Sequence, residues 1–219
     1  MKKGISWCLL ASLIVACIMI AGCSKGSGSQ SLADLINKGK QIKSMSADYA
    51  ATTPDGKTAG GTIWGQKGKL FKIETTVNGV KNVIILNYID KTMIMYEPAI
   101  KRGTKMKLSQ SQSKPPGDYL NDIDLSKVQD FGTAVISGET CRVFQYTNAD
   151  GATIKMWLSV DLGFPAQITS TTADGQTTTA EYTNIKVGSL PGDTFKVPAN
   201  VKIKDMTSVN QPQNLSTQQ

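Results

Sequence analysis

The stretch ATIKMWLSVDLGFPAQI, which runs from Ala152 to Ile168, predicts two β-strands joined by a tight turn. The segment ATIKMWLS has the composition of a strand, and a second strand returns from Pro165 onward. Between them stands Gly163-Phe164-Pro165, and Gly and Pro favour turns because Gly permits a positive φ and Pro restricts φ. The next turn, Ala173-Asp174-Gly175, is of the same kind. We therefore expect this part of the chain to fold as consecutive antiparallel hairpins.

Strand-like segments continue on both sides of this stretch. From Ser46 to about Leu108 six of them follow one another, and the hairpin-type residues Pro54-Asp55-Gly56 and Asn78-Gly79 stand between some of them. Further strands run from Ala134 to a closing segment, FKVPANVKI, at residues 195–203. The pattern predicts one long antiparallel sheet that meanders along the chain.

Two helical elements interrupt this pattern. Ser31 is followed three residues later by Asp34, and apolar residues from Leu32 to Met45 recur at near-helical spacing. These features predict a capped amphipathic helix at the start of the domain. Residues 110–133 form an insertion between the two series of strands, with one or two short helical turns expected in it.

The first 22 residues have the pattern of a bacterial export signal. Two lysines precede an apolar run from Ile5 to Ile20, and small residues follow. The sequence Ile20-Ala21-Gly22-Cys23 resembles the lipobox of bacterial lipoproteins, in which the cysteine thiol takes a diacylglyceryl group and becomes the new N-terminus. We therefore expect residues 1–22 to be a signal peptide and Cys23 to be lipidated. The alternative is an uncleaved transmembrane helix, although the run is near the lower length limit for crossing a bilayer.

The remaining chain divides into three parts. Residues 23–30 comprise the lipidated Cys23 and a Gly/Ser-rich flexible tether. Residues 31–204 form the folded domain, which is long enough for one sizeable core. Residues 205–219 are polar, and we expect them to be a disordered tail. Cys141 is the only cysteine in the folded domain, so we expect a buried apolar residue on a strand, with a reactive thiol as the alternative.

The charge and composition of the chain indicate neither nucleic-acid binding nor catalysis. Without Lys2 and Lys3 of the signal, 22 basic residues stand against 17 acidic ones, a mild surplus. Its local cluster, from Lys101 to Lys107, fits a solvated surface that tolerates anionic lipid headgroups. With few aromatic residues and no basic stripe, we expect no nucleic-acid partner. The chain has no histidine, which removes Ser-His-Asp and Cys-His catalysis and the commonest transition-metal ligand, and Cys141 has no second cysteine for a metal site. We expect no catalytic residues, no enzyme activity, no metal site and no cofactor; a pair of catalytic carboxylates, which no motif marks, is the alternative.

The order of these elements resembles the LolA/LolB-like lipoprotein-carrier family. The resemblance rests on the Ala152–Ile168 stretch with its Asp-Gly hairpin, on AEYTNIKV (180–187) and on the closing LPGDTFKVP (190–198). It covers nearly the whole folded domain, and its motifs are structural, so they support fold more than function. The resemblance implies an α+β fold. A strongly curved antiparallel sheet, or incomplete β-barrel, has its concave face covered by an N-terminal helix and a short helical insertion.

The resemblance also implies a hydrophobic cavity that accepts the acyl chains of a lipid or lipoprotein. Because this chain has the Cys23 anchor that the soluble carrier lacks, we expect a lipid-anchored envelope protein that takes part in lipoprotein or lipid sorting or transfer. Ser24 replaces the aspartate that retains lipoproteins in the inner membrane. We expect the periplasmic face of the outer membrane in a diderm and the outer face of the plasma membrane in a monoderm. The alternative is a non-carrier adaptor or sensor that binds an envelope protein.

The cavity lining is predicted from the alternation of side chains along strands. In GKLFKIETTV (68–77), Phe71 and Ile73 share one face, which we assign to the cavity, while Lys72 and Glu74 point to solvent.

A second strand offers two choices for the same lining. In TMIMYE (92–97), Met93 and Met95 compete with Ile94 and Tyr96 for the concave side. We assign Met93 and Met95 to the cavity. For all the predicted lining residues the alternative is an ordinary core between sheet and helices.

Overall fold

The computed structural model describes residues 30–109, 115, 120 and 123–208. The predicted signal peptide, Cys23, nearly all of the predicted tether and most of the predicted tail lie outside these residues. Among the described residues, none of the helices has the length and apolarity needed to span a bilayer.

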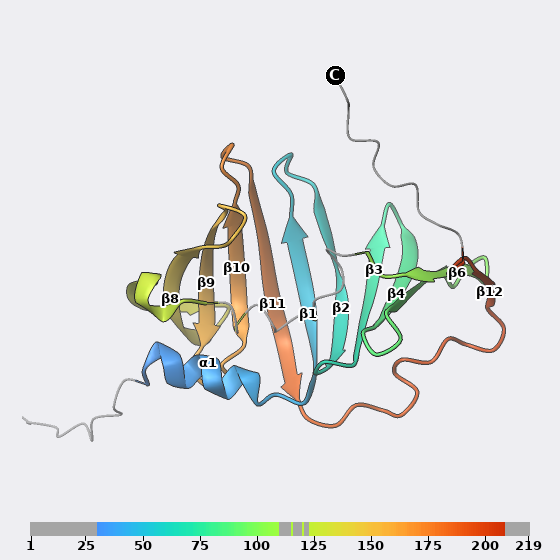
Figure 1. The fold of residues 1–219 in the computed structure, drawn as a ribbon, viewed down its shortest axis with the longest axis horizontal. Helices are drawn as coiled ribbons and strands as arrows, with labels where there is room; N and C mark the ends of the chain where they lie inside the picture. Colours follow the sequence, from blue (N-terminus) through green and yellow to red (C-terminus); the bar gives the residue numbers. More distant parts are fainter. Residues whose placement is uncertain (1–29, 110–114, 116–119, 121–122, 209–219) are drawn as a thin grey trace, which may run out of the picture.

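One twelve-stranded sheet forms the body of the molecule (Figure 1). Its strand order is β12-β6-β5-β4-β3-β2-β1-β11-β10-β9-β8-β7. Hairpins form where the sequence supplies residues that adopt a positive φ, such as Asn78 at 52° and Gly79 at 78°. The strands are β1 (Ser44–Thr52), β2 (Thr58–Gln66), β3 (Leu70–Val77), β4 (Val80–Asn87), β5 (Thr92–Glu97), β6 (Arg102–Lys107), β7 (Gln129–Ile136), β8 (Glu139–Thr147), β9 (Thr153–Ser159), β10 (Pro165–Thr171), β11 (Thr177–Val187) and β12 (Lys202–Asp205).

The sheet consists of two meanders, not the single one that the sequence predicts. Strands β1 to β6 and strands β7 to β11 each follow the chain order, and the two series meet where β1 pairs antiparallel with β11. The segment between β6 and β7 therefore connects strands from opposite parts of the sheet. The prediction failed here because turn residues indicate only neighbours in sequence, whereas the β1–β11 pairing depends on the apolar faces of distant strands.

The closing segment is a strand only at its end. The sequence predicts a strand at residues 195–203, whereas β12 begins at Lys202 and pairs parallel with β6. Pro198 lacks the backbone N–H that a ladder position requires, which disfavours an earlier start. Upstream of β12, Phe195 and Val197 pack on a buried cluster of β4 and β5 that consists of Val83, Ile85 and Tyr96. The segment thus covers the outer face of the sheet.

Helix α1 (Leu32–Lys40) opens the domain, as predicted, but it is shorter than the apolar spacing suggested. The Ser31 hydroxyl accepts a hydrogen bond from the Asp34 N–H at 3.2 Å, and the Asp34 carboxylate accepts one from the Ser31 N–H at 3.2 Å. This reciprocal capping box satisfies two donors of the first turn. Met45, which continues the helical spacing, belongs to β1. Pairing with β2 and β11 therefore overrides the helical pattern at its end.

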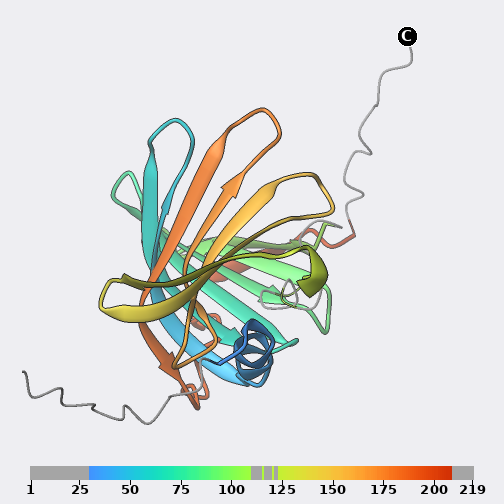
Figure 2. The same ribbon diagram turned by 90° about the vertical axis from the view of Figure 1, so that its left-hand side faces the viewer.

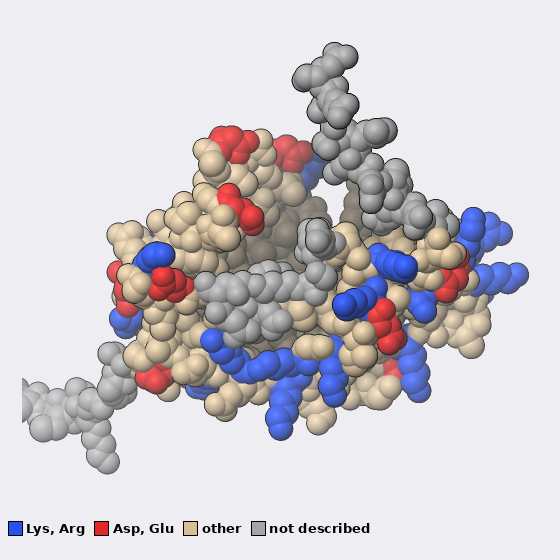
Figure 3. Space-filling view, in the orientation of Figure 1, with Lys and Arg blue, Asp and Glu red and all other residues tan. Residues whose placement is uncertain are grey.

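The helix lies in the hollow of the curved sheet (Figure 2), and this face is visibly hollowed in Figure 3. Leu35 and Ile36 of α1 are buried against Phe144, Met156 and Leu158 of β8 and β9. Leu120, from the segment between β6 and β7, joins the same cluster, and this segment also contains the 3-10 helix η2 (Leu125–Lys127). The predicted fold class is confirmed: an α+β fold with a strongly curved, unclosed antiparallel sheet.

The outer face of β3 carries a cluster of charges. Lys72 and Glu74 pair across the sheet with the outward Ile85 and Val83, but their side chains are only 13% and 23% exposed. The two side chains thus lie on the outer face, as predicted, but they are partly buried there and do not extend into solvent. The two side chains form an ion pair at 2.7 Å, and Lys81 binds the same carboxylate at 2.5 Å. Burial alone would raise the pKa of Glu74, but the hydrogen bonds from the two lysines outweigh it and lower that pKa.

Candidate functional site

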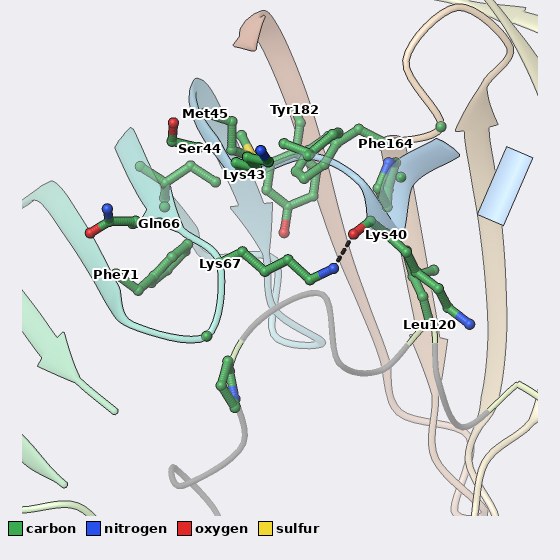
Figure 4. A pocket seen from close by; sticks show the side chains of 18 of the residues that line it. Lys40, Lys43, Ser44, Met45, Gln66, Lys67, Phe71, Leu120, Phe164 and Tyr182 are labelled. Atoms are coloured by element: carbon green, nitrogen blue, oxygen red, sulfur yellow. Dashed lines mark hydrogen bonds between the residues drawn. The ribbon is translucent and has the colours of Figure 1, made fainter. Parts of the chain in front are cut away.

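An apolar pocket lies on the concave side, where α1 ends and β1 begins (Figure 4). Its volume is about 160 Å³, and it is partly open to solvent. The lining comes from the inner faces of several strands, from the turn between β9 and β10 and from the segment between β6 and β7. Its large apolar side chains include Met45, Ile63, Phe71, Leu120, Phe164 and Tyr182.

Local features of the sequence explain the shape of the pocket. Gly65 pairs with Met45 on one side and with Phe71 on the other. A Cβ there would already lie 3.4 Å from the Phe71 ring, so the glycine lets the Phe71 side chain lie close over β2. On the opposite wall, the rings of Phe164 and Tyr182 meet edge to face, with 5.5 Å between centroids. These apolar side chains form two walls of the pocket.

Two glycines allow α1 to close one side of this hollow. A Cβ atom on Gly163 would lie 2.4 Å from the Leu35 carbonyl oxygen and 2.5 Å from the Gly39 nitrogen. Gly163 also has a φ of 65°, a conformation that Gly adopts readily. A Cβ on Gly39 of α1 would likewise clash with the Gly163 carbonyl oxygen. The two glycines together therefore permit the backbone of α1 to contact the turn after β9.

The structure places both predicted lining residues of β3 on the concave side. Phe71 lines the pocket. Ile73 is partly buried and packs against the cluster of Met45, Ala47 and Ile63. It lies beside the pocket but is not one of the residues that line it.

The two predicted methionines of β5 lie on the same face as Phe71 and Ile73. Met93 pairs with Leu86 and Met95 with Ile84, and these two β4 residues pair in turn with Phe71 and Ile73. Met93 is 7% exposed and Met95 is 40% exposed. Neither belongs to the pocket lining. Ile94 and Tyr96 face the other way and pack under the closing segment.

Three lysines at the pocket were missed by the sequence reasoning. Lys40 and Lys43 come from the junction of α1 and β1, and Lys67 comes from the turn between β2 and β3. The Lys67 ammonium donates a hydrogen bond to the Lys40 carbonyl (Figure 4). Because the pairing of β1 with β2 brings these segments together, no local motif could have revealed the group.

The described residues offer little chemistry besides apolar contact and these cations. They contain no group of three or more His, Cys, Asp and Glu side chains arranged to hold a metal ion. Cys141 is buried on β8, as predicted. Burial raises the pKa of its thiol to about 11, so the thiol is protonated at neutral pH and is a poor nucleophile.

A family model described as "Outer membrane lipoprotein carrier protein LolA" matches residues 40–198. The matched range contains every pocket residue named above except Gly39. No curated protein sequence matches the chain significantly.

Solved structures resemble this one at low sequence identity. An uncharacterized conserved protein from Thermus thermophilus matches with a TM-score of 0.58 and 10% identity, over 80% of this chain and 99% of that chain. A chain in the MucA/MucB complex of Pseudomonas aeruginosa matches with a TM-score of 0.52 and 15% identity, over 79% of this chain and 63% of that chain. This chain thus spans less than two thirds of that chain's length. The Mycobacterium tuberculosis lipoprotein LppX matches with a TM-score of 0.48 and 13% identity, over 73% of this chain and 97% of that chain. The first two likenesses concern the fold alone.

Proposed function

We propose that this chain, which belongs to the LolA family of outer membrane lipoprotein carrier proteins, binds acyl chains of a lipid or lipoprotein in its apolar pocket. The observation that carries the proposal is the pocket itself, which apolar side chains of the sheet and of the segment between β6 and β7 enclose on the concave side. An acyl chain placed there gains about 25 cal/mol for each Å² of apolar surface removed from water. Family membership supports a lipid-like guest over other apolar ligands.

The volume of the pocket limits the length of chain that it holds without rearrangement. At about 160 Å³, it is similar in size to apolar cavities of roughly 150 Å³ that bind benzene-sized guests. We therefore expect the pocket to hold part of one acyl chain.

A titration tests the proposed binding. The chain from Ser24 to Gln219, produced without the anchor, should bind a fluorescent fatty-acyl probe saturably, and an unlabelled long-chain lipid should displace the probe. If the protein is folded and shows no saturable binding, the proposed carrier function is contradicted.

We also propose that the protein acts at a membrane surface. Acyl groups on Cys23 would hold it at a membrane surface in the cell envelope, where it would take part in sorting or transfer of lipoproteins or lipids. Each buried methylene contributes about 0.8 kcal/mol, so the two or three chains of a bacterial lipoprotein make such an anchor effectively permanent.

Cys23→Ala is expected to abolish lipidation and leave an uncleaved or soluble form. Cys23 is the only cysteine in a lipobox-like sequence, and no other residue is placed to receive the diacylglyceryl group. Metabolic labelling with an alkyne fatty acid measures the change. Equal incorporation into the wild type and the variant would show that the lipobox interpretation is wrong.

A second candidate function is the binding of an envelope protein along β7. This strand ends the sheet, and no strand among the described residues pairs with its free side. Phe131 and Val135 of β7 are 48% and 68% exposed. An open edge with exposed apolar side chains is able to accept an extended segment of a partner as an additional strand.

Cross-linking in cells distinguishes this function from the first. A partner bound along β7 should be lost from the double variant Phe131→Ser/Val135→Lys and retained by Phe71→Asp, which alters only the pocket. Retention of the partner by the edge variant would exclude β7 as the interface.

A further inference from the structure

The pocket has a basic mouth. Its described lining residues include Lys40, Lys43 and Lys67 and contain no Asp or Glu. Lys43 and Lys67 are exposed and Lys40 is half-buried, so their charges lie where the apolar lining meets water. In Figure 3, basic side chains gather along the lower edge of the molecule, while acidic side chains mark the tips of the β1–β2 and β10–β11 hairpins above. The pocket thus lies at the basic end of the half-barrel.

The main chain fixes the spacing of this group. The pairing of Ser44 with Gln66 places the junction of α1 and β1 beside the turn between β2 and β3. A hydrogen bond from the Lys67 N–H to the Lys43 carbonyl, at 2.9 Å, extends this pairing by one step. Backbone pairing therefore holds the main chain of Lys43 beside that of Lys67, and the hydrogen bond of Lys67 to the Lys40 carbonyl keeps Lys40 at the same part of the pocket.

The ammonium groups of the three lysines could bind an anionic acceptor. Lys67 donates to the Lys40 carbonyl, which is a neutral acceptor. None of the three lysines forms an ion pair with a described carboxylate. An anionic oxygen attracts an ammonium by a full charge–charge interaction, which a neutral carbonyl oxygen does not provide. An anion at the mouth would therefore replace the carbonyl as the partner of Lys67.

We propose that Lys40, Lys43 and Lys67 select an anionic amphiphile, with its acyl chain in the pocket and a phosphate or carboxylate headgroup among the three lysines. This inference rests on the proposed binding of acyl chains and adds the charge of the ligand. Lysine suits this place because its methylenes cover the apolar rim while its ammonium stays in water. The headgroup supplies specificity, and the chain supplies most of the affinity.

Amphiphiles that share one chain and differ in headgroup charge test the inference. The chain from Ser24 to Gln219 is titrated, below each critical micelle concentration, with dodecyl phosphate, dodecyl maltoside and dodecyl trimethylammonium. Displacement of the fluorescent acyl probe gives the affinities. The phosphate should bind about tenfold more tightly than the maltoside, since three partly exposed ion contacts together contribute about that factor. The trimethylammonium should bind most weakly.

Two triple variants provide the test and its control. Lys40→Gln/Lys43→Gln/Lys67→Gln should lose the preference, so that dodecyl phosphate and dodecyl maltoside bind with equal affinity. Lys57→Gln/Lys196→Gln/Lys204→Gln removes the same charge from exposed lysines outside the pocket lining and should keep the preference. The single variant Lys67→Gln should lose part of it, and circular dichroism confirms that each variant is folded.

The outcomes separate this inference from the proposed function. Equal wild-type affinity for the three amphiphiles, or a preference that survives in the pocket triple variant, overturns the inference and leaves acyl binding in place. Displacement by inorganic phosphate as effective as that by dodecyl phosphate would assign the lysines to a free anion and would also overturn it. Binding of none of the amphiphiles contradicts the proposed function itself, and the inference falls with it.

Discussion

Phe71→Asp is expected to lower the affinity for the fluorescent acyl probe by at least about a hundredfold. Phe71 lines the pocket, pairs with Gly65 of β2 and packs against the cluster that contains Met45 and Ile63. A carboxylate at this place would lie against an apolar chain and would lose hydration when the chain binds. Titration of the probe into the chain from Ser24 to Gln219 measures the change.

The control for this variant lies on the same strand. Val77 is 46% exposed and does not line the pocket, so Val77→Asp should change the affinity by no more than about twofold. Thermal unfolding of both variants, followed by circular dichroism, separates loss of binding from loss of fold. A folded Phe71→Asp protein with wild-type affinity would place the acyl chain elsewhere.

Gly163→Ala is expected to lower the free energy of unfolding by at least about 3 kcal/mol. The φ of 65° at this position costs an L-residue roughly 1–2 kcal/mol. In addition, the new Cβ would lie 2.4 Å from the Leu35 carbonyl oxygen and 2.5 Å from the Gly39 nitrogen. Both are backbone atoms, so α1 must move away from the turn after β9. Urea unfolding measures the loss of stability.

Gly175→Ala separates the two contributions. Gly175 has a φ of 83°, and a Cβ there would meet nothing within 4 Å. This variant should lose only the conformational part, about 1 kcal/mol. Similar losses in the two variants would contradict the close packing of α1 on the turn after β9.

Most of the local structure could be predicted from the sequence because it depends on neighbours in the chain. Ser31 and Asp34 form the expected capping box, and Asn78 and Gly79 form the expected hairpin turn. Alternation along β3 correctly separates Phe71 from Lys72. The fold class followed from these local signals together with the resemblance to a family.

What the sequence could not give depends on pairing between distant segments. The contact of β1 with β11 turns one expected meander into two, and no turn residue marks it. The closing segment shows an apolar alternation that fits a strand. In the structure, however, its Phe195 and Val197 pack on the outer face of the sheet without forming a strand. The choice between Met93 and Ile94 also required the register with β4.

The same reason explains the candidate site. Phe71 could be proposed as a lining residue because the alternation along its own strand indicates its face. Phe164 comes from a turn and Leu120 from an insertion, and no sequence periodicity relates these two residues to Phe71. The lysines of the mouth are likewise separate in sequence. Only the fold brings apolar walls and basic rim together.

Native mass spectrometry of the chain from Ser24 to Gln219, purified without detergent and without the anchor, tests acyl binding most directly. The wild type should retain a non-covalent adduct with the mass of a cellular lipid, and the folded Phe71→Asp variant should lose it. A folded wild-type protein that shows no adduct, even after incubation with lipid vesicles, would contradict the carrier function and favour binding of an envelope protein.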